Sequence, residues 1–135
     1  MPRIPAPPIP GIAAFFKLRP ETGLPLCQLA EALLRGPSSL TPGERETIAA
    51  VVSTANDCAF CARSHAAAAS SHTADPTGVA AACADPRGHA PSAKMRALFD
   101  LALAVRDSGK AVTDAHVERA RAAGADDVAI HDTVL

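Results

Sequence analysis

Aromatic side chains are almost absent from this chain, and that feature limits the folds that it can adopt. The 135 residues include four Phe and no Trp or Tyr. The core must therefore be built from Ala, Leu, Ile and Val, and a core rich in alanine suits closely packed helices. No segment shows the alternating apolar pattern of a strand. We therefore expect an all-α bundle of about six to seven helices, with residues 1–135 forming one domain.

The composition and the charge exclude several classes of protein. Apolar residues make up 48% and charged residues 20%, as in soluble globular proteins rather than disordered ones. The net charge of −1 and the lack of a basic cluster argue against a nucleic-acid-binding or membrane-anchoring surface. No apolar run approaches the roughly 18 residues of a membrane span, and the N-terminus lacks the pattern of a secretory signal. A cytoplasmic protein without nucleic-acid or membrane partners is expected.

Prolines and glycines divide the chain into segments of helix length. Residues 1–23 are rich in proline and are expected to form an extended arm, whereas residues 24–135 are expected to form the helical core. Capping residues and apolar spacing predict helices over residues 26–35, 42–55, 58–71, 76–84, 92–108, 114–123 and 126–135. The last helix reaches Leu135 without a stop signal, so we expect it to be cut short.

The clearest helix start lies at residues 41–44, with the sequence Thr-Pro-Gly-Glu. The threonine is an N-cap, the proline occupies the first helical position, and the glutamate completes a capping box. This helix is expected to end near Ala55, because Asn56 and Asp57 break it. The next helix is expected to begin near Cys58, so that two helices joined by a short turn can pack antiparallel.

Cys58, Cys61 and His65 are spaced so that they share one face of the second of these helices. At ~100° per residue the three side chains fall within about 60°, and Cys61 and His65, four residues apart, can meet. A thiol reacts as the thiolate, and a free cysteine with a pKa of about 8.5 is mostly protonated at neutral pH. The helix N-terminus can stabilise an anion on Cys58, and His65 can accept the proton of Cys61. The two cysteines can also close a disulfide if the helix start deforms slightly.

Glu46 lies 12 residues before Cys58, on the preceding helix. If the two helices pack antiparallel, Glu46 can face His65. A carboxylate there would orient the imidazole and raise its basicity. The predicted catalytic residues are therefore Cys61, Cys58, His65 and Glu46, and neither a cofactor nor a metal is expected.

The other cysteines, histidines and charged residues are assigned structural or solvent-exposed positions. Cys27 and Cys83 have apolar neighbours and are expected in the core. Charged residues at 106–107 and 118–121 are expected to form an ordinary solvated face. The remaining histidines are expected at solvated or capping positions: His72, His89, His116 and His131. A pocket beside the reactive cysteines is expected to be lined by Val51, Val52, Phe60 and residues of the 92–108 helix.

Several alternatives to a catalytic thiol pair remain open. Zinc is one, since Cys58, Cys61 and His65 could be joined by His72, Cys83 or His89, although no second closely spaced ligand pair accompanies the first. The pair could also be inert and buried, or cycle as a redox sensor or structural subunit without catalysis. A further alternative is a decarboxylase-like enzyme that uses His65 as a base.

The pattern E-x11-C-x2-C-x3-H, formed by Glu46, Cys58, Cys61 and His65, resembles the core of the alkylhydroperoxidase AhpD-like proteins. The surrounding residues 44–65, ERETIAAVVSTANDCAFCARSH, are similar to that core in nearly every apolar position. The later segment DDVAIHDTVL resembles a helix start in the uncharacterised peroxidase-related branch of the same superfamily. The resemblance covers about residues 24–135.

This resemblance implies the all-α fold that these proteins share with carboxymuconolactone decarboxylases, in homo-oligomers such as trimers, hexamers or dimers. It implies a thiol-dependent peroxidase or disulfide reductase in which a proton relay runs from Glu46 through His65 to the cysteines. Cys61 would attack the hydroperoxide and become a sulfenic acid, Cys58 would resolve it to a disulfide, and a lipoamide-like dithiol would reduce the disulfide. Phe60 stands where the best-studied members have a histidine, which implies a simpler relay.

Overall fold

The computed structural model describes residues 4–135, and within this range the prediction of an all-α protein is confirmed. Eight α-helices and one short 3-10 helix are present between residues 4 and 135, rather than the six to seven helices expected. The chain divides into two compact units, with the boundary between Pro37 and Ser38. None of the helices in the described range has the length and the apolar character needed to cross a membrane.

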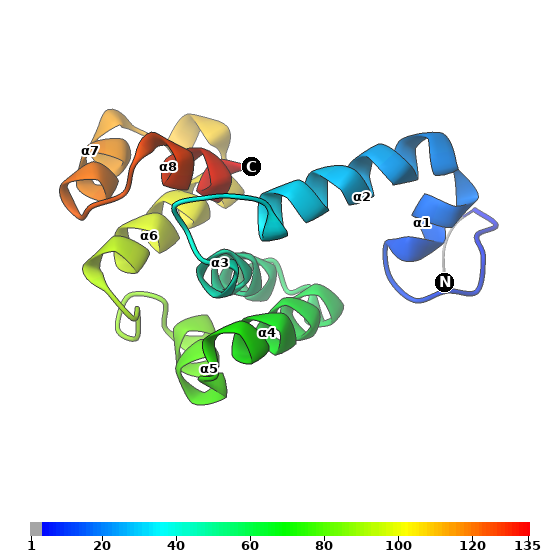
Figure 1. Ribbon diagram of the computed structural model, residues 1–135, viewed down its shortest axis with the longest axis horizontal. Coiled ribbons are helices and arrows are strands. Elements are labelled where there is room, and N and C mark those ends of the chain that lie inside the picture. The colour runs from blue at the N-terminus through cyan, green and yellow to red at the C-terminus, as the bar shows by residue number, and fades with distance from the viewer. Residues whose placement is uncertain (1–3) are drawn as a thin grey trace. The chain divides into compact units, whose positions relative to one another are not determined.

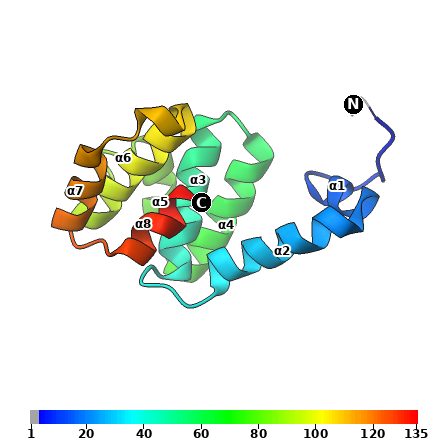
Figure 2. The same cartoon turned by 90° about the horizontal axis from the view of Figure 1, so that it is seen from above.

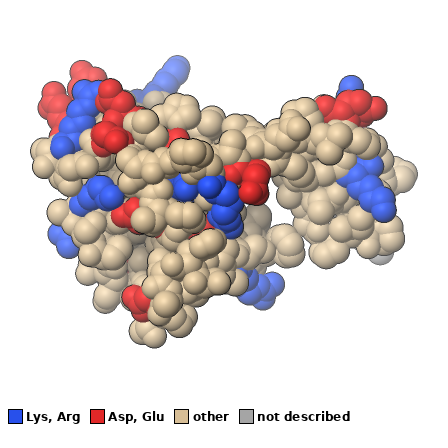
Figure 3. Space-filling view, viewed as in Figure 1, with Lys and Arg blue, Asp and Glu red and all other residues tan. Residues whose placement is uncertain are grey.

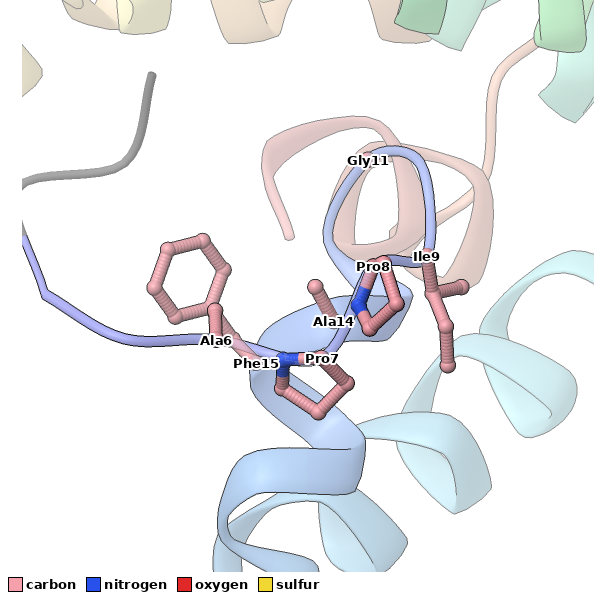
Figure 4. Close-up of a pocket in the computed structure, with 7 residues that line it drawn as sticks. All are labelled: Ala6, Pro7, Pro8, Ile9, Gly11, Ala14 and Phe15. Atoms are coloured by element: carbon pink, nitrogen blue, oxygen red, sulfur yellow. The ribbon is translucent and has the colours of Figure 1, made fainter.

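The first unit contains the helices α1 (Ala13–Leu18) and α2 (Pro20–Arg35). Residues 13–18 and 20–23 are therefore helical, and the expectation of an extended arm over residues 1–23 is wrong for this part of it. Residues 4–12 contain no helix, and Figure 4 shows this segment curling over the start of α1. A cavity of about 500 Å³ lies there, lined by Ala6, Pro7, Pro8, Ile9, Gly11, Ala14 and Phe15.

Two features explain why this proline-rich segment still forms helices. Pro20 occupies the first turn of α2, where its missing N–H would have no intrahelical partner. Gly23 lets α2 cross α1 closely, since a Cβ at Gly23 would lie 2.6 Å from the Cα of Phe16. Pro25 lies inside α2, so the helix tolerates a residue that sequence rules treat as a helix breaker.

The second unit is a bundle built around α3 (Figures 1 and 2). Helix α3 packs against α4, α5 and α6, while α7 and α8 pack against α6. The remaining elements of this unit are α3 (Pro42–Ala55), α4 (Ala59–Thr73), α5 (Pro76–Ala84), α6 (Ala93–Asp107), the 3-10 helix η1 (Gly109–Ala111), α7 (Asp114–Ala122) and α8 (Asp127–Val134). These bounds follow the helices predicted after residue 41 closely, because capping residues mark most of their starts.

The core of the second unit lies between α3, α6 and the last two helices. Met95, Leu98 and Phe99 on α6 are at most 1% exposed and pack with Leu40 and Val51. Burial of each such side chain contributes about 1.5–3 kcal/mol. Fully buried alanines complete the core, as the composition predicts, and they allow the helices to approach one another closely.

Helices α3 and α4 run side by side in opposite directions, joined by a short turn (Figure 2). Gly43 at the start of α3 touches the end of α4, since a Cβ there would lie 2.6 Å from Cγ2 of Thr73. Ala50 and Ala69 are both 0% exposed. Small buried residues on both helices thus allow the two helices to approach each other closely.

Charged side chains gather over α7, where Figure 3 shows acidic and basic atoms next to each other. Arg121 donates to Asp127 at 2.7 Å, and both side chains are more than half exposed. Surface pairs of this kind contribute little to stability. Residues 118–121 lie on this helix, as the prediction of a solvated face requires.

Candidate functional site

The start of α3 is held by the predicted capping box. Glu44 N–H donates to Oγ1 of Thr41 at 3.1 Å, and the Thr41 N–H donates to the Glu44 carboxylate at 2.8 Å. Lys94 of α6 forms an ion pair with Glu44 at 3.0 Å. Burial raises the pKa of Glu44, but the hydrogen bonds from Thr41 and Lys94 outweigh it, so that its pKa is lowered. Because this helix start is fixed, Glu46, two residues after Glu44, faces α4.

Glu46 and His65 meet between the two antiparallel helices. Nδ1 of His65 lies 2.7 Å from Oε2 of Glu46. Glu46 is 2% exposed, whereas the His65 side chain is 31% exposed. When Nδ1 carries the proton, it donates to the carboxylate, and Nε2 keeps a lone pair that can accept a proton. The contact that the antiparallel packing was expected to allow is therefore present.

The turn between α3 and α4 fixes the backbone of Cys58 on both sides. The N–H of Cys58 donates to the carbonyl of Ser53 at 3.1 Å, and the N–H of Asp57 donates to that of Thr54 at 3.0 Å. With Asp57 in the left-handed region (φ 54°), these two bonds form a Schellman motif that ends α3. The carbonyl of Cys58 then accepts from the N–H of Ala62 at 2.8 Å, because Cys58 is also the N-cap of α4.

Cys58 and Cys61 are both reduced and partly buried, and their sulfur atoms are hydrogen-bonded to each other. The hydrogen bond from Cys61 lowers the pKa of the Cys58 thiol, helped by the backbone N–H groups of Cys61 and Phe60 at the helix start. The same bond raises the pKa of Cys61, which keeps its proton and donates it. The reduced pair thus favours an anion on Cys58, as the position of Cys58 at the helix N-terminus predicts.

A cavity of about 230 Å³ opens beside Cys58. It is lined by Thr54, Asp57, Cys58, Ala59 and Ala62. The pocket predicted from the sequence is wrong in its lining, because Val51 is 1% exposed within the core and Phe60 is 48% exposed on the surface. The small lining side chains leave room for a compact substrate next to the sulfur.

The remaining cysteines and histidines lie in different surroundings. Cys27 is exposed on α2, so its prediction as a core residue is wrong. Cys83 is partly buried, and burial raises its pKa while a hydrogen bond with Thr54 opposes that shift. His116 caps α7, since its Nδ1 accepts from the N–H of Thr113 at 3.2 Å. Between residues 4 and 135, no group of three or more His, Cys, Asp or Glu side chains is arranged to hold a metal ion.

One residue that contacts the turn before Cys58 could not be predicted from the sequence. Arg106, assigned to a solvated face, donates from Nε to Oδ1 of Asn56 at 2.9 Å and from Nη2 to the carbonyl of Ala55 at 2.5 Å. The two residues are 50 positions apart in the sequence, so no local pattern links them. A basic residue in the last turn of a helix is the only local signal, and that signal is common.

Comparison with known proteins identifies relatives of this chain. The sequence profile of the carboxymuconolactone decarboxylase family matches residues 20–104. None of the curated proteins is similar enough in sequence to count as a match. Two solved structures have the same fold over 93% of this chain.

The first of these structures is described as the alkylhydroperoxidase AhpD core of an uncharacterized peroxidase-related protein from Ralstonia eutropha JMP134, with 26% sequence identity and a TM-score of 0.84. The second is an uncharacterized peroxidase-related protein from Silicibacter sp. TM1040, with 27% identity and a TM-score of 0.83. This chain spans 66% and 65% of the length of those two proteins, respectively.

Proposed function

The chain belongs to the carboxymuconolactone decarboxylase family, and we propose that it acts there as a thiol-dependent peroxidase that reduces hydroperoxides with Cys58 and Cys61. The observation that carries this proposal is the 2.7 Å contact between Glu46 of α3 and His65 of α4, because α4 also carries the hydrogen-bonded thiol pair at its start. The descriptions of the two similar structures as peroxidase-related support the same activity. No metal or other cofactor takes part in the proposed reaction.

In the first step, the sulfur of Cys61 attacks the outer oxygen of the hydroperoxide and the O–O bond breaks. The Cys61 proton passes to His65, and the imidazolium gives a proton to the alkoxide, which leaves as the alcohol. Cys61 is thereby oxidised to a sulfenic acid, and the hydroperoxide is reduced by two electrons. Glu46 orients His65 for this transfer and stabilises the imidazolium that forms.

In the second step, the Cys58 thiolate attacks the sulfenic sulfur of Cys61 and hydroxide leaves, which is released as water after protonation. The lowered pKa of Cys58 supports this role, because the resolving group is then available as the nucleophile. An external dithiol of the lipoamide class then reduces the disulfide and is itself oxidised to its cyclic disulfide. The cytoplasm is the proposed compartment, since reducing conditions there restore the dithiol.

We also propose that the protein works as a homo-oligomer, a trimer or hexamer or a dimer. Large apolar side chains of the first unit support this, since Ile12 and Leu24 are 62% and 64% exposed. Exposed apolar surface of this kind is typical of subunit contacts. Light scattering of the purified protein would show a mass of a single chain, 13.8 kDa, if this proposal is wrong.

The first experiment measures dihydrolipoamide-dependent consumption of tert-butyl hydroperoxide. We expect turnover by the wild-type protein, none by Cys61→Ser, and unchanged turnover by the control Cys27→Ser, which removes an exposed thiol outside the site. Full activity of Cys61→Ser would refute the assignment. If neither the wild type nor the variants turn over, metal content and the reversibility of the disulfide separate the zinc and redox-sensor alternatives.

A second experiment separates the roles of the two cysteines. In Cys58→Ser the sulfenic acid on Cys61 has no resolving partner, so a dimedone adduct should accumulate on Cys61 after one equivalent of peroxide. In Cys61→Ser no adduct should form on Cys58. An adduct on Cys58 in Cys61→Ser would reverse the proposed roles, and the lowered pKa of Cys58 would then mark the attacking thiol.

A decarboxylase-like activity is the second candidate, favoured by the name of the matching family and by the Glu46–His65 pair. His65 would serve as the base in that reaction, and the thiols would take no part. Turnover of a carboxylated lactone that survives alkylation of both cysteines would support it. Loss of all activity on alkylation would count against it.

A further inference from the structure

Arg106 connects the last turn of α6 with the turn that carries Cys58. Its Nη2 donates to the carbonyl of Ala55 at 2.5 Å, and its Nε donates to Oδ1 of Asn56 at 2.9 Å. Its Nη1 pairs with Asp107 on the same helix at 2.7 Å. The side chain is 35% exposed, so the three contacts lie at the protein surface. The guanidinium thus touches both of the residues at which α3 ends.

The contact with Ala55 completes the end of α3. The Schellman bonds satisfy the carbonyls of Ser53 and Thr54 but not that of Ala55, which comes next in the chain. A guanidinium at this place supplies a donor and a positive charge to the negative end of the helix dipole. Charged hydrogen bonds are stronger than neutral ones, and the two contacts fix the guanidinium plane as well as its position.

Helix α6 anchors the other end of this connection in the core. Leu98, Phe99 and Leu101 on α6 are each 0% exposed. Arg106 follows them by one to two turns of the same helix, so the backbone from which it extends is well fixed. The turn before Cys58 is therefore tied to the hydrophobic core and not only to its own helix.

The spacing of the two sulfur atoms differs between the dithiol and the disulfide. A disulfide brings the two sulfur atoms to about 2.05 Å, far closer than the hydrogen-bonded thiols of the reduced pair. Backbone bonds from both helices hold Cys58, so a shift of residues 55–58 on oxidation would strain these bonds and the contacts of Arg106 with Ala55 and Asn56.

We propose that residues 55–58 shift when the Cys58–Cys61 disulfide closes. Arg106 is a positioning residue that holds these residues in the dithiol arrangement, so that the disulfide is a stronger oxidant. This inference rests on the disulfide step of the proposed function. It does not depend on the peroxide step. Arg106 touches neither the substrate nor the sulfur atoms and acts through the position of the turn.

The test is the equilibrium of the thiol pair with glutathione. Two thiols of the protein lose two electrons and two protons, and one glutathione disulfide takes them up to give two glutathione thiols. The fraction of the Cys58–Cys61 disulfide is measured by alkylation and mass spectrometry across buffers of different glutathione ratio. In Arg106→Ala we expect the equilibrium to shift toward the disulfide by about tenfold, which is about 30 mV in potential for this two-electron couple.

Three further variants make the result specific. Arg96→Ala removes an exposed arginine from the same helix and should keep the wild-type equilibrium. Arg106→Lys keeps the charge but not both hydrogen bonds, so its equilibrium should lie between those of the wild type and Arg106→Ala. Asn56→Ala removes one of the contacts of Arg106 from the side of the turn and should shift the equilibrium toward the disulfide by a smaller amount. This variant tests the contact even if Arg106→Ala folds poorly.

Each outcome has a distinct meaning. An equilibrium within twofold of the wild type in both Arg106→Ala and Asn56→Ala overturns the positioning role, as does an equal shift in Arg96→Ala. A shift toward the dithiol would also overturn it. Failure of the wild type to form the disulfide in any buffer refutes both this inference and the disulfide step of the proposed function. Disulfide formation without peroxide turnover refutes only the peroxidase activity.

Discussion

At the scale of single residues, the site depends on a carboxylate that is almost completely buried. A charged carboxylate is costly to bury unless hydrogen bonds and an opposite charge compensate for the lost water. Glu46 is 2% exposed and lies 2.7 Å from Nδ1 of His65. The carboxylate therefore favours the imidazole with its proton on Nδ1 and stabilises a positive charge on the ring. This orientation leaves Nε2 as the atom that can move a proton.

Replacing Glu46 by Gln should lower peroxidase kcat/KM by about 100-fold, which is within the range that a proton-transfer group contributes. The amide retains the size of the side chain but neither the charge nor the preference for one tautomer of His65. We expect a similar KM and a reduced kcat in a steady-state assay with tert-butyl hydroperoxide.

Glu44→Gln is the matched control for this change. It lies one half-turn away on the same helix, and a glutamine can still complete the capping box with Thr41. Its activity should therefore stay within about twofold of the wild type. An equal loss of activity in Glu44→Gln and Glu46→Gln would indicate a general effect of charge on α3 and would contradict the relay.

The predicted site residues differ in how well the sequence located them. Glu46, Cys58, Cys61 and His65 could be placed because helical spacing and one short turn determine their relative positions. Arg106 could not, because its contact with Asn56 joins two helices far apart in the sequence. Phe60 was misplaced for another reason: an apolar residue beside a cysteine was expected to line the pocket, but its helix turns it outward to 48% exposure.

At the scale of helices, the starts that are marked by local capping residues could be predicted from the sequence. The starts that depend on tertiary contacts could not. The capping box at Thr41 forms as predicted, and Asp75 and Ser92 cap the predicted helices α5 and α6. Each depends on a side chain within three residues of the helix start, so the sequence contains all the information needed. Helix α1 and the first turns of α2 were missed because their support comes from Gly23 packing against Phe16, a contact that propensity rules do not include.

The turn at Asp57 gives a prediction at this scale. Its φ of 54° lies in the left-handed region, which aspartate and asparagine tolerate but a β-branched residue does not. Asp57→Val should therefore lower the free energy of unfolding by about 1–2 kcal/mol, measured by urea denaturation. Asp57→Asn should change it by less than about 0.5 kcal/mol. Equal stability of the two variants would show that the turn can rearrange without strain.

At the scale of the second unit as a whole, two carboxylates at α8 form hydrogen bonds with the first residues of the unit. Ser38 donates to Asp132 at 2.6 Å, and Ser39 donates to Asp126 at 2.6 Å. These contacts join positions 94 and 87 residues apart in the sequence. They close the unit by tying the residues that lead into α3 to both ends of α8.

Both carboxylates have lowered pKa values. For Asp126 the cause is the hydrogen bond from Ser39, followed by the N–H of Ala129. For Asp132 burial raises the pKa, but hydrogen bonds from Ser38 and His131 and the charges of His131 and Arg45 outweigh it. A carboxyl group whose pKa is lower in the folded state contributes stability that is complete above its unfolded pKa of about 3.9 and is lost as the pH falls through its folded pKa.

The melting temperature should therefore be nearly constant between about pH 5 and 7 and should fall as the pH drops below about 4. Asp132→Asn removes the charge that Ser38 contacts, so at pH 7 it should lower the free energy of unfolding by about 1 kcal/mol. It should also flatten the decline in acid, because one of the groups that take up protons on unfolding is gone. Circular dichroism melts at half-unit steps of pH measure both effects.

Glu118→Gln is the control, since Glu118 is exposed on α7 and its loss removes one negative charge without touching the contacts of α8. Its pH profile should run parallel to that of the wild type. If Asp132→Asn and Glu118→Gln have the same profile, net charge rather than the contact with Ser38 accounts for the stability. If Asp132→Asn alone already has at pH 7 the low melting temperature that the wild type has in acid, the contact between Ser38 and Asp132 stabilises the second unit at neutral pH.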